Sequence, residues 1–293
     1  RGVAVAGGLG VSLSAVESVA FPLFGAGVGN QITNSVCASI TSCQGTSQGV
    51  VLGVVSRHGD LRLSASDESS ITGDGGGADI SAAFGSLSVA AAIAAGIARN
   101  TITNSTSALI HSSTVTANGH VDLSASSTPT IRGLALGVAL AASSSTVGAT
   151  AGGSGASATN TAKNTITALL SDGSRVEAGS TDSNAVSVSA TDDASITTQV
   201  SAGFLGVTAT TGGGGLAVGA VLGTNEVENT ITAGIGAANG SDSSTVVSQG
   251  GVDVSASSTA DVHAFGLAVA ATITVSESGA AFSGSGASLT NTI

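Results

Sequence analysis

The sequence contains no tryptophan, tyrosine or methionine, and six phenylalanines are its only aromatic residues in 293 positions. Charged residues make up 9% of the chain, far below the roughly 25% of an ordinary globular domain. The hydrophobic share is nevertheless 42%, so the chain lacks the charge-rich, apolar-poor composition of a disordered protein. Strong helix formers are scarce, whereas Gly, Ala, Ser, Thr and Val are plentiful. This composition predicts β-sheet rather than helix.

Basic residues are few, and Lys163 is the only lysine among seven Lys and Arg, against 18 Asp and Glu. The net charge of −11 leaves no basic patch for nucleic acid and disfavours an anionic membrane surface. No run reaches the ~18 uninterrupted apolar residues of a membrane-spanning helix. The opening Arg1-Gly2-Val3 shows no signal-peptide pattern, and we expect the chain to be a piece of something longer.

Two cysteines, Cys37 and Cys43, lie six residues apart. A disulfide across a short loop and two free thiols are both compatible with this spacing, and we favour the disulfide. A disulfide would indicate an oxidising, extracellular compartment.

A tandem repeat organises the chain. Its first marker is a Val-x-Val-Ser-Ala-Ser-like strand that begins at Leu61, Val121, Val186 and Val252, at intervals of 60, 65 and 66 residues. The second marker, Asn-x-Ile, keeps the same order and begins at Asn30, Asn100, Asn164, Asn229 and Asn291. Two markers in constant order predict a stacked repeat array. The units span approximately residues 1–71, 72–131, 132–196 and 197–262, with a partial unit at 263–293. The first unit carries an insertion around residues 42–50.

Each unit opens with a strand whose two faces differ in side-chain size. In the third unit Leu134, Leu136, Val138 and Leu140 alternate with Gly and Ala. We expect the large side chains to form a core, because each buried Val or Leu contributes ~1.5–3 kcal/mol. The Gly/Ala face then either packs closely on another sheet or faces water. Gly dipeptides such as Asn118-Gly119 and Gly250-Gly251 predict tight two-residue turns.

No unit can close a core alone, so its strands need those of the neighbouring units. We therefore predict an all-β, repetitive β-solenoid, with three coils of ~20 residues and ~14 Å of advance per unit. Tandem β-sandwich or prism units are the alternative.

The apolar Ala/Gly strand, Asn-Thr-Ile-Thr and Val-x-Val-Ser-Ala-Ser together resemble the repeats of giant secreted bacterial exoproteins. These are the filamentous-haemagglutinin-like, leukotoxin-type and autotransporter adhesins. The resemblance implies a stiff β-solenoid stalk or fibre outside the cell, bacterial in origin, that serves attachment or builds surface filaments. It brings no catalytic residues with it. The cysteine-bearing insertion departs from the usual pattern of such arrays.

Polar clusters give little indication of chemistry. Residues 73–79 read Gly-Asp-Gly-Gly-Gly-Ala-Asp, a single imperfect copy of a calcium-binding motif that works in tandem, and we interpret them as a loop. The pairs Asp67-Glu68 and Asp192-Asp193 recur at one place in the repeat and are interpreted as solvated turns. The four histidines are scattered, without converging metal ligands. We therefore expect no catalytic, cofactor-binding or metal-ligating residue, and no cofactor.

The periodic asparagines are the most distinctive polar feature. If the units stack in register, the side chains of Asn30, Asn100, Asn164, Asn229 and Asn291 are candidates for a hydrogen-bonded ladder along the axis. The alternative is that each satisfies its local backbone at a turn or strand edge.

Tandem units without a unique polar cluster predict a non-enzymatic structural segment of an extracellular fibre or adhesin stalk. Its partners would be further copies, head to tail or laterally, and a cell-surface or glycan receptor. A polysaccharide-binding or polysaccharide-degrading β-helix protein is the alternative, although Trp and Tyr, on which sugars stack, are absent. A third class of function is binding to ice or mineral through rows of Thr. Thr-x-Thr occurs once per unit, and such rows are too sparse to match a lattice if each unit makes several coils.

Overall fold

The computed structural model describes residues 1–42, 45–47, 50–236 and 243–293, and the chain is all-β within them. The strands are β1 (Gly2–Leu13), β2 (Glu17–Ala20), β3 (Leu23–Thr41), β4 (Gly45–Ser47), β5 (Val50–Leu52), β6 (Val54–Ser56), β7 (Leu61–Asp67), β8 (Ser70–His111), β9 (Thr114–Ala117), β10 (Val121–Ser127), β11 (Thr130–Ser171), β12 (Arg175–Ala178), β13 (Val186–Ile235), β14 (Thr245–Ser248), β15 (Val252–Val275) and β16 (Ser278–Thr292).

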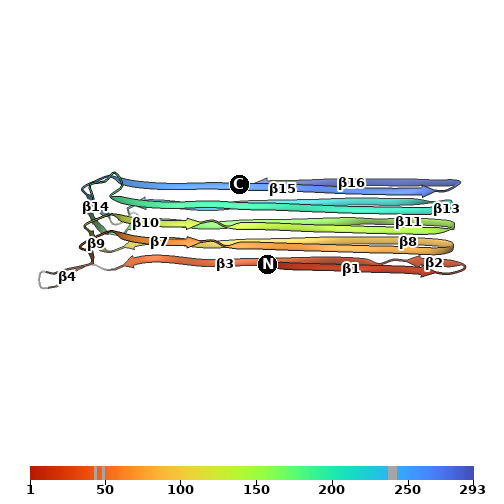
Figure 1. The fold of residues 1–293 in the computed structure, drawn as a ribbon, viewed down its shortest axis with the longest axis horizontal. Coiled ribbons are helices and arrows are strands. Elements are labelled where there is room, and N and C mark those ends of the chain that lie inside the picture. Colours follow the sequence, from red (N-terminus) through yellow and green to blue (C-terminus); the bar gives the residue numbers. More distant parts are fainter. Residues whose placement is uncertain (43–44, 48–49, 237–242) are drawn as a thin grey trace.

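Each unit forms one flattened coil with an outgoing and a returning arm (Figure 1). In one such coil β7 and the first half of β8 run out, the chain reverses between Gly77 and Ala95, which face each other across the interior, and the rest of β8 returns. The outgoing arms of successive units form one layer, here the front sheet, and the returning arms form the back sheet. The bends lie at one end of the molecule and the short strands β6, β9, β12 and β14 at the other, here the loop end.

Hydrogen-bonded pairing crosses every border between units. β8 pairs in parallel with β11 from Thr130↔Ser70 to Ser171↔His111, and β11 pairs in the same way with β13. β1, β2 and β3 pair with β8, and β15 and β16 pair with β13. The only antiparallel pair among the described residues is β4 with β5. The predicted β-solenoid is confirmed, and the described strands form no separate sandwich or prism units.

The prediction of three coils per unit is wrong. Strand partners lie a whole unit apart, for example Asn100 beside Asn160 and Asn160 beside Asn225. Each unit is therefore a single long coil and advances the solenoid by one strand spacing, ~4.8 Å rather than ~14 Å. Because an arm holds some 25 residues at ~3.3 Å each, the coil is ~80 Å wide.

The corners at the loop end differ from the predicted tight turns. Gly119, Gly250 and Gly251 do not have positive φ; positive φ occurs where the returning arms end, at Ser42 (55°), Ser112 (48°), Asp172 (55°), Gly173 (73°) and Gly236 (149°). The strands beside Asn118-Gly119 do not pair with each other as a hairpin, because β9 pairs with β6 and β12, and β10 with β7 and β13. The insertion of the first unit carries the β4–β5 pair.

The half of each coil next to the loop end has an ordinary core. Large side chains lie between the sheets, and serines and threonines face outward. The buried residues include Ile71, Ile102, Ile110, Leu123, Ile131, Ile166, Leu170, Val176, Val186, Val188 and Ile196. We call this part the polar half, after its surface.

The half next to the bends is inverted, and the predicted core of large side chains is wrong there. Its interior holds mainly Gly and Ala, such as Ala90, Ala92, Ala94, Ala139 and Ala217, and in the fourth unit also the buried side chains of Val200, Phe204 and Val221. Leu134, Leu136 and Val138 are instead 39%, 42% and 44% exposed on the outer surface. The Gly/Ala faces of the two sheets pack against each other, which was one of the two predicted placements. We call this part the apolar half.

Strand parity, the alternation of side chains between the inner and outer face of a strand, explains the inversion. Ile131 is buried, and the strand continues without a bulge, so Gly133, Ala135 and Gly137 point inward while the leucines between them point outward. At many inward positions the two sheets then approach too closely for larger residues, and the buried ring of Phe204 is accommodated against Gly152. A Cβ atom on Gly75 would lie 2.1 Å from the carbonyl oxygen of Ile97 in the opposite sheet.

Candidate functional site

A row of asparagines runs along the axis between the two halves. The side-chain amide of Asn30 donates to Asn100 at 2.8 Å, Asn100 to Asn160 at 2.8 Å, Asn160 to Asn225 at 3.1 Å, and Asn225 to Asn291 at 2.9 Å. Asn100, Asn160 and Asn225 are fully buried. Each amide donates to one neighbour and accepts from the other, so these hydrogen bonds join all five units.

Two of the predicted ladder residues, Asn164 and Asn229, lie in a second row four residues further along the strand. There the backbone N–H of Asn164 donates to Oδ1 of Asn229 at 3.2 Å, and that of Asn34 to Oδ1 of Asn104 at 3.2 Å. The predicted single row is therefore two rows. Sequence reasoning missed Asn160 and Asn225, although Asn-x3-Asn recurs in four units and places both amides on one strand face.

Two buried carboxylates complete the second row. Asp67 accepts hydrogen bonds from the side-chain amides of Asn34 (3.0 Å) and Asn104, and Asp192 from those of Asn164 (3.3 Å) and Asn229. Asp67 and Asp192 are only 4% and 2% exposed. Their interpretation as solvated turn residues is wrong; only the neighbours Glu68 and Asp193 face outward. Burial raises the pKa of Asp192 to about 6, while the Asn164 amide lowers this pKa and Asp193 raises it.

The Gly-rich segment 73–79 is also not a loop. It lies inside β8, paired with β1 on one side and β11 on the other. Asp79 points into the interior of the apolar half, where Oδ2 accepts the backbone N–H of Ile93 at 3.0 Å and Oδ1 has no partner. Burial raises the pKa of Asp79, and the N–H groups of Ile93 and Ile80 lower it.

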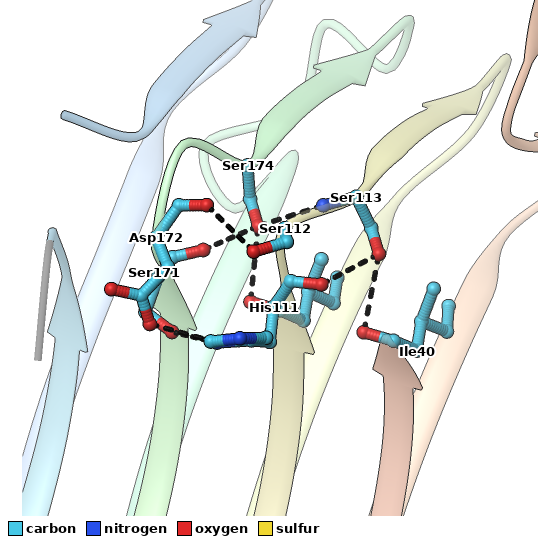
Figure 2. Close-up of polar contacts among 8 residues, drawn as sticks. Ile40, His111, Ser112, Ser113, Ser171, Asp172 and Ser174 are labelled. Carbon is cyan, nitrogen blue, oxygen red and sulfur yellow. Dashed lines mark hydrogen bonds and ion pairs between the residues drawn. The ribbon is translucent and has the colours of Figure 1, made fainter. Parts of the chain in front are cut away.

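The corner where the second and third units meet at the loop end carries a cluster of serines with one histidine and one aspartate (Figure 2). Nδ1 of His111 lies 2.7 Å from Oδ2 of Asp172 and 3.3 Å from Oγ of Ser171. Ser113 donates to the carbonyl oxygens of His111 (2.8 Å) and Ile40 (3.4 Å).

The cluster lacks the geometry of a nucleophilic triad. Such a triad needs the serine on one ring nitrogen and the carboxylate on the other, whereas Ser171 and Asp172 share Nδ1 of His111. Its serines hold backbone carbonyls across neighbouring units: Ser112 donates to Asp172 (3.1 Å), and Ser174 donates to Ile110 (3.2 Å). These hydrogen bonds connect the corners of adjacent coils.

Two other histidines also make local pairs. His120 contacts Asp182 (3.1 Å) and the carbonyl oxygen of Asn184 (3.0 Å), and His263 contacts Asp261 (3.0 Å). The contact with the Asn184 carbonyl is the main cause of the raised pKa of His120. His58 lies exposed at the loop end. Within the described part of the chain, no group of three or more His, Cys, Asp or Glu side chains is placed to hold a metal ion.

The predicted disulfide cannot be placed, because Cys43 lies outside the described residues. Cys37 is an exposed free cysteine on the back sheet.

The polar half of the back sheet exposes rows of Ser and Thr, because one coil per unit brings Ser35, Ser105, Thr165 and Thr230 side by side. A shallow cavity of about 420 Å³ follows these strands, and Lys163 and Glu228 pair within it. The Thr-x-Thr pairs of the third and fourth units lie side by side, Thr165 beside Thr230 and Thr167 beside Thr232, whereas Thr101 and Thr103 of the second unit pair with Thr161 and Lys163.

The surface of the apolar half differs chemically from that of the polar half. Both faces of the apolar half expose Val, Leu, Ile and Phe side chains, among them Val5, Ile97, Val218, Leu222 and Phe265, each at least half exposed. Contiguous apolar surfaces of this extent mark contact sites on soluble proteins. This surface, rather than a cluster of reactive side chains, is the candidate functional site.

No family model matches the chain, and no curated protein or solved structure was found to be similar to it. Over the residues with described structure, no helix is long and apolar enough to cross a membrane.

Proposed function

We propose that the chain is a non-enzymatic structural segment of an extracellular fibre or adhesin stalk. The observation that carries this proposal is the parallel pairing between units, with partners as far apart as the repeat itself, from β1 through β8, β11 and β13 to β15. A single hydrogen-bonded body of this kind transmits tension along its axis through every coil. The resemblance to secreted bacterial adhesins, the near absence of basic residues and the side-chain rows along the axis agree with it.

One coil per unit determines the form that the fibre would take. Each unit adds ~4.8 Å along the axis and spans ~80 Å across it. The fibre is therefore a ribbon that is much wider than a rod of ~20-residue coils. Units added at either end would pair with β1 and β3 or with β15 and β16, each of which has a strand partner on one side only. The partners of the fibre segment are further units of the same kind and a cell-surface or glycan receptor.

Electron microscopy of the native full-length protein tests the proposal. We expect flat ribbons ~80 Å wide, with a ~4.8 Å repeat along their length in diffraction. Compact, isolated particles without such a repeat would contradict it. A screen on neutral and acidic polysaccharides tests the enzymatic alternative, and reproducible cleavage would overturn the non-enzymatic assignment.

A further inference from the structure

The apolar half of the back sheet is interrupted in the first unit. β2 ends at Ala20 and β3 begins at Leu23, so Phe21 and Pro22 lie outside the strands. The register is the same on both sides, because Ala20 and Leu23 pair with residues of β8 that are equally far apart. In the second, third and fourth units the strands continue through the corresponding positions. The interruption is therefore a local loss of pairing in an otherwise regular ladder.

The hydrogen-bond pattern shows which groups of β8 face the interruption. The N–H of Leu87 donates to the carbonyl oxygen of Val16, one residue before the strand partner of Leu87. Continued along the strand, this pattern would join the N–H of Ile93 to the carbonyl oxygen of Pro22. It would also join an N–H of residue 22 to the carbonyl oxygen of Ala91, but proline has no N–H. One donor and one acceptor of β8 thus lose their ladder partners, and buried backbone groups need replacements.

Two polar side chains of the front sheet reach the interruption across the interior. Oδ2 of Asp79 accepts the N–H of Ile93 at 3.0 Å, in the place of a backbone carbonyl. Oγ of Ser81 donates to the carbonyl oxygen of Ala20, the last residue of β2, at 2.9 Å. Asp79 and Ser81 are buried, so both hydrogen bonds are formed away from water.

The buried carboxyl group belongs to the unit that pairs with the interrupted one. Within the described part of the chain, Asp79 is the only Asp, Glu, Lys, Arg or His whose side chain is buried in the apolar half. From the first unit to the fifth, the residues at its position are Gly8, Asp79, Ala139, Phe204 and Ala270. The carboxyl group therefore coincides with the one place where the ladder of this half is open.

We propose that Asp79 is a pH-sensitive latch that fastens the returning arm of the first unit to β8. In its neutral form the carboxyl group replaces both missing ladder partners: Oδ2 accepts the N–H of Ile93, and the O–H on Oδ1 donates to the carbonyl oxygen of Ala91. Ionisation releases the proton to solvent and removes the donor. The carboxylate then faces a carbonyl oxygen that it cannot bond, and the arm is held less firmly.

The surroundings of Asp79 favour the neutral form. Oδ1 has no other partner, and a neutral carboxyl offers one donor together with an acceptor. Burial raises the pKa of Asp79. The residues that line this part of the interior carry no charge; they are Gly8, Gly10, Ala20, Pro22, Phe24, Ser81, Ala92, Ala94, Ala139, Gly152 and Ser154. No cation is therefore at hand to stabilise the carboxylate.

The latch goes beyond the axial fibre proposed above and does not depend on it, because it concerns how one arm is held within the chain. It predicts that the first unit is fastened most firmly at acidic pH. The local protection of the Ile93 N–H reports the latch, whether or not the chain builds a fibre.

Two substitutions of Asp79 in the full chain test the hydrogen bonds. Asp79→Asn keeps an acceptor and a donor and cannot ionise, whereas Asp79→Ala removes both. Amide hydrogen exchange, expressed as the protection factor of Ile93, is the measurement. We expect Asp79→Asn to protect Ile93 at least as well as the wild type at pH 7, and Asp79→Ala to lower the protection roughly tenfold. Equal protection in Asp79→Asn and Asp79→Ala would overturn the latch.

A double-mutant cycle with Pro22→Ala tests the link to the interruption. Alanine restores the N–H at position 22 and allows the ladder to close, so Asp79→Ala in this background should change the protection of Ile93 by about twofold at most. An undiminished effect of Asp79→Ala would show that the carboxyl group does not replace the missing ladder partners, and this would overturn the proposal.

A pH series from 4 to 8 tests the switch. In the wild type the protection of Ile93 should fall over the same pH range in which the ¹³C signal of the Asp79 carboxyl titrates, and in Asp79→Asn it should not follow that titration. Asp74→Asn, at an outward-facing carboxylate of the same strand, is the control and should behave as the wild type. Protection in the wild type that is unaffected by the titration of Asp79, or that is changed as strongly by Asp74→Asn, would contradict a pH-sensitive latch.

Discussion

A Cβ atom added to Gly137 would lie 2.2 Å from the carbonyl oxygen of Gly155 in the opposite sheet. These two glycines show how closely the sheets approach in the apolar half. Neither neighbour can yield cheaply, because the contacting atoms belong to paired backbone. At such positions a small residue is therefore a steric requirement, and most of the large side chains of this half lie on the surface.

Gly137→Ala should destabilise the fold by about 1–3 kcal/mol through overpacking. Gly203→Ala is the matched control, since it lies on a central strand and an added Cβ has no atom within 4 Å. Urea denaturation of both variants measures the difference. Equal stability of the two variants would show that the sheets are further apart than described.

Asn160→Ala should cost about 1–3 kcal/mol for each polar group that it leaves buried and unpaired. Asn100, Thr198 and Asn225 all hydrogen-bond to Asn160. Thr159→Ala, at the outward-facing position next to it, should change the free energy of unfolding by less than ~0.5 kcal/mol. If both variants unfold at the same urea concentration, the ladder does not stabilise the stack.

Stability should rise as the pH is lowered from 7 to 5. The pKa values of Asp192 and Asp79 are raised in the folded protein from the ordinary 3.8, that of Asp192 to about 6. The native state therefore binds protons that the unfolded chain releases, and stability is lost as the pH rises through the folded pKa.

The measurement is the free energy of unfolding by urea at a series of pH values. Asp192→Asn should flatten the curve, whereas Asp193→Asn, at an exposed neighbour, should leave most of the slope. A wild type that grows steadily less stable between pH 7 and pH 5 would show that these carboxyls are ionised and well solvated in the native state.

Asp172 should tolerate glycine better than valine. Its φ of 55° lies in the left-handed region, which glycine adopts freely and a β-branched residue resists. Asp172→Asn keeps the preference for this conformation and removes the ion pair to His111, which is partly exposed and worth at most ~1 kcal/mol. In thermal denaturation, the melting temperatures of Asp172→Gly and Asp172→Asn should lie close to that of the wild type, and that of Asp172→Val well below it. Val at the level of Gly would show that the corner is not constrained.

The repeat, the β-solenoid and the position of the insertion follow from patterns that one sequence carries. The interior of the apolar half was predicted wrongly because side-chain size was given more weight than the alternation of inward- and outward-facing positions along a strand. Every second residue after Ile131, namely Gly133, Ala135 and Gly137, lies on the buried face, and nothing in the sequence interrupts this alternation. The ladder was misassigned in two units because Asn-x-Ile was followed instead of the Asn-x3-Asn pairs.

Other features have no local signal. The number of coils per unit depends on whether a strand pairs within its own unit or with the next, and both choices satisfy the same alternation of side chains. The close approach of Gly75 to Ile97 depends on how two arms fold onto each other, 22 residues apart in sequence. The burial of Asp79 follows from its strand parity and runs against the usual exposure of a carboxylate.

The central claim is that each unit is one coil, so that corresponding residues of successive units are adjacent. Ser64, Ser124, Ser189 and Ser255 are in register on successive strands of the front sheet. In a background without Cys37 and Cys43, spin labels at Ser64→Cys and Ser255→Cys permit the separation to be measured by pulsed electron paramagnetic resonance. Three strand spacings predict backbone positions ~14 Å apart, whereas three coils per unit would place them ~43 Å apart. A distance distribution centred on the longer value would contradict the account.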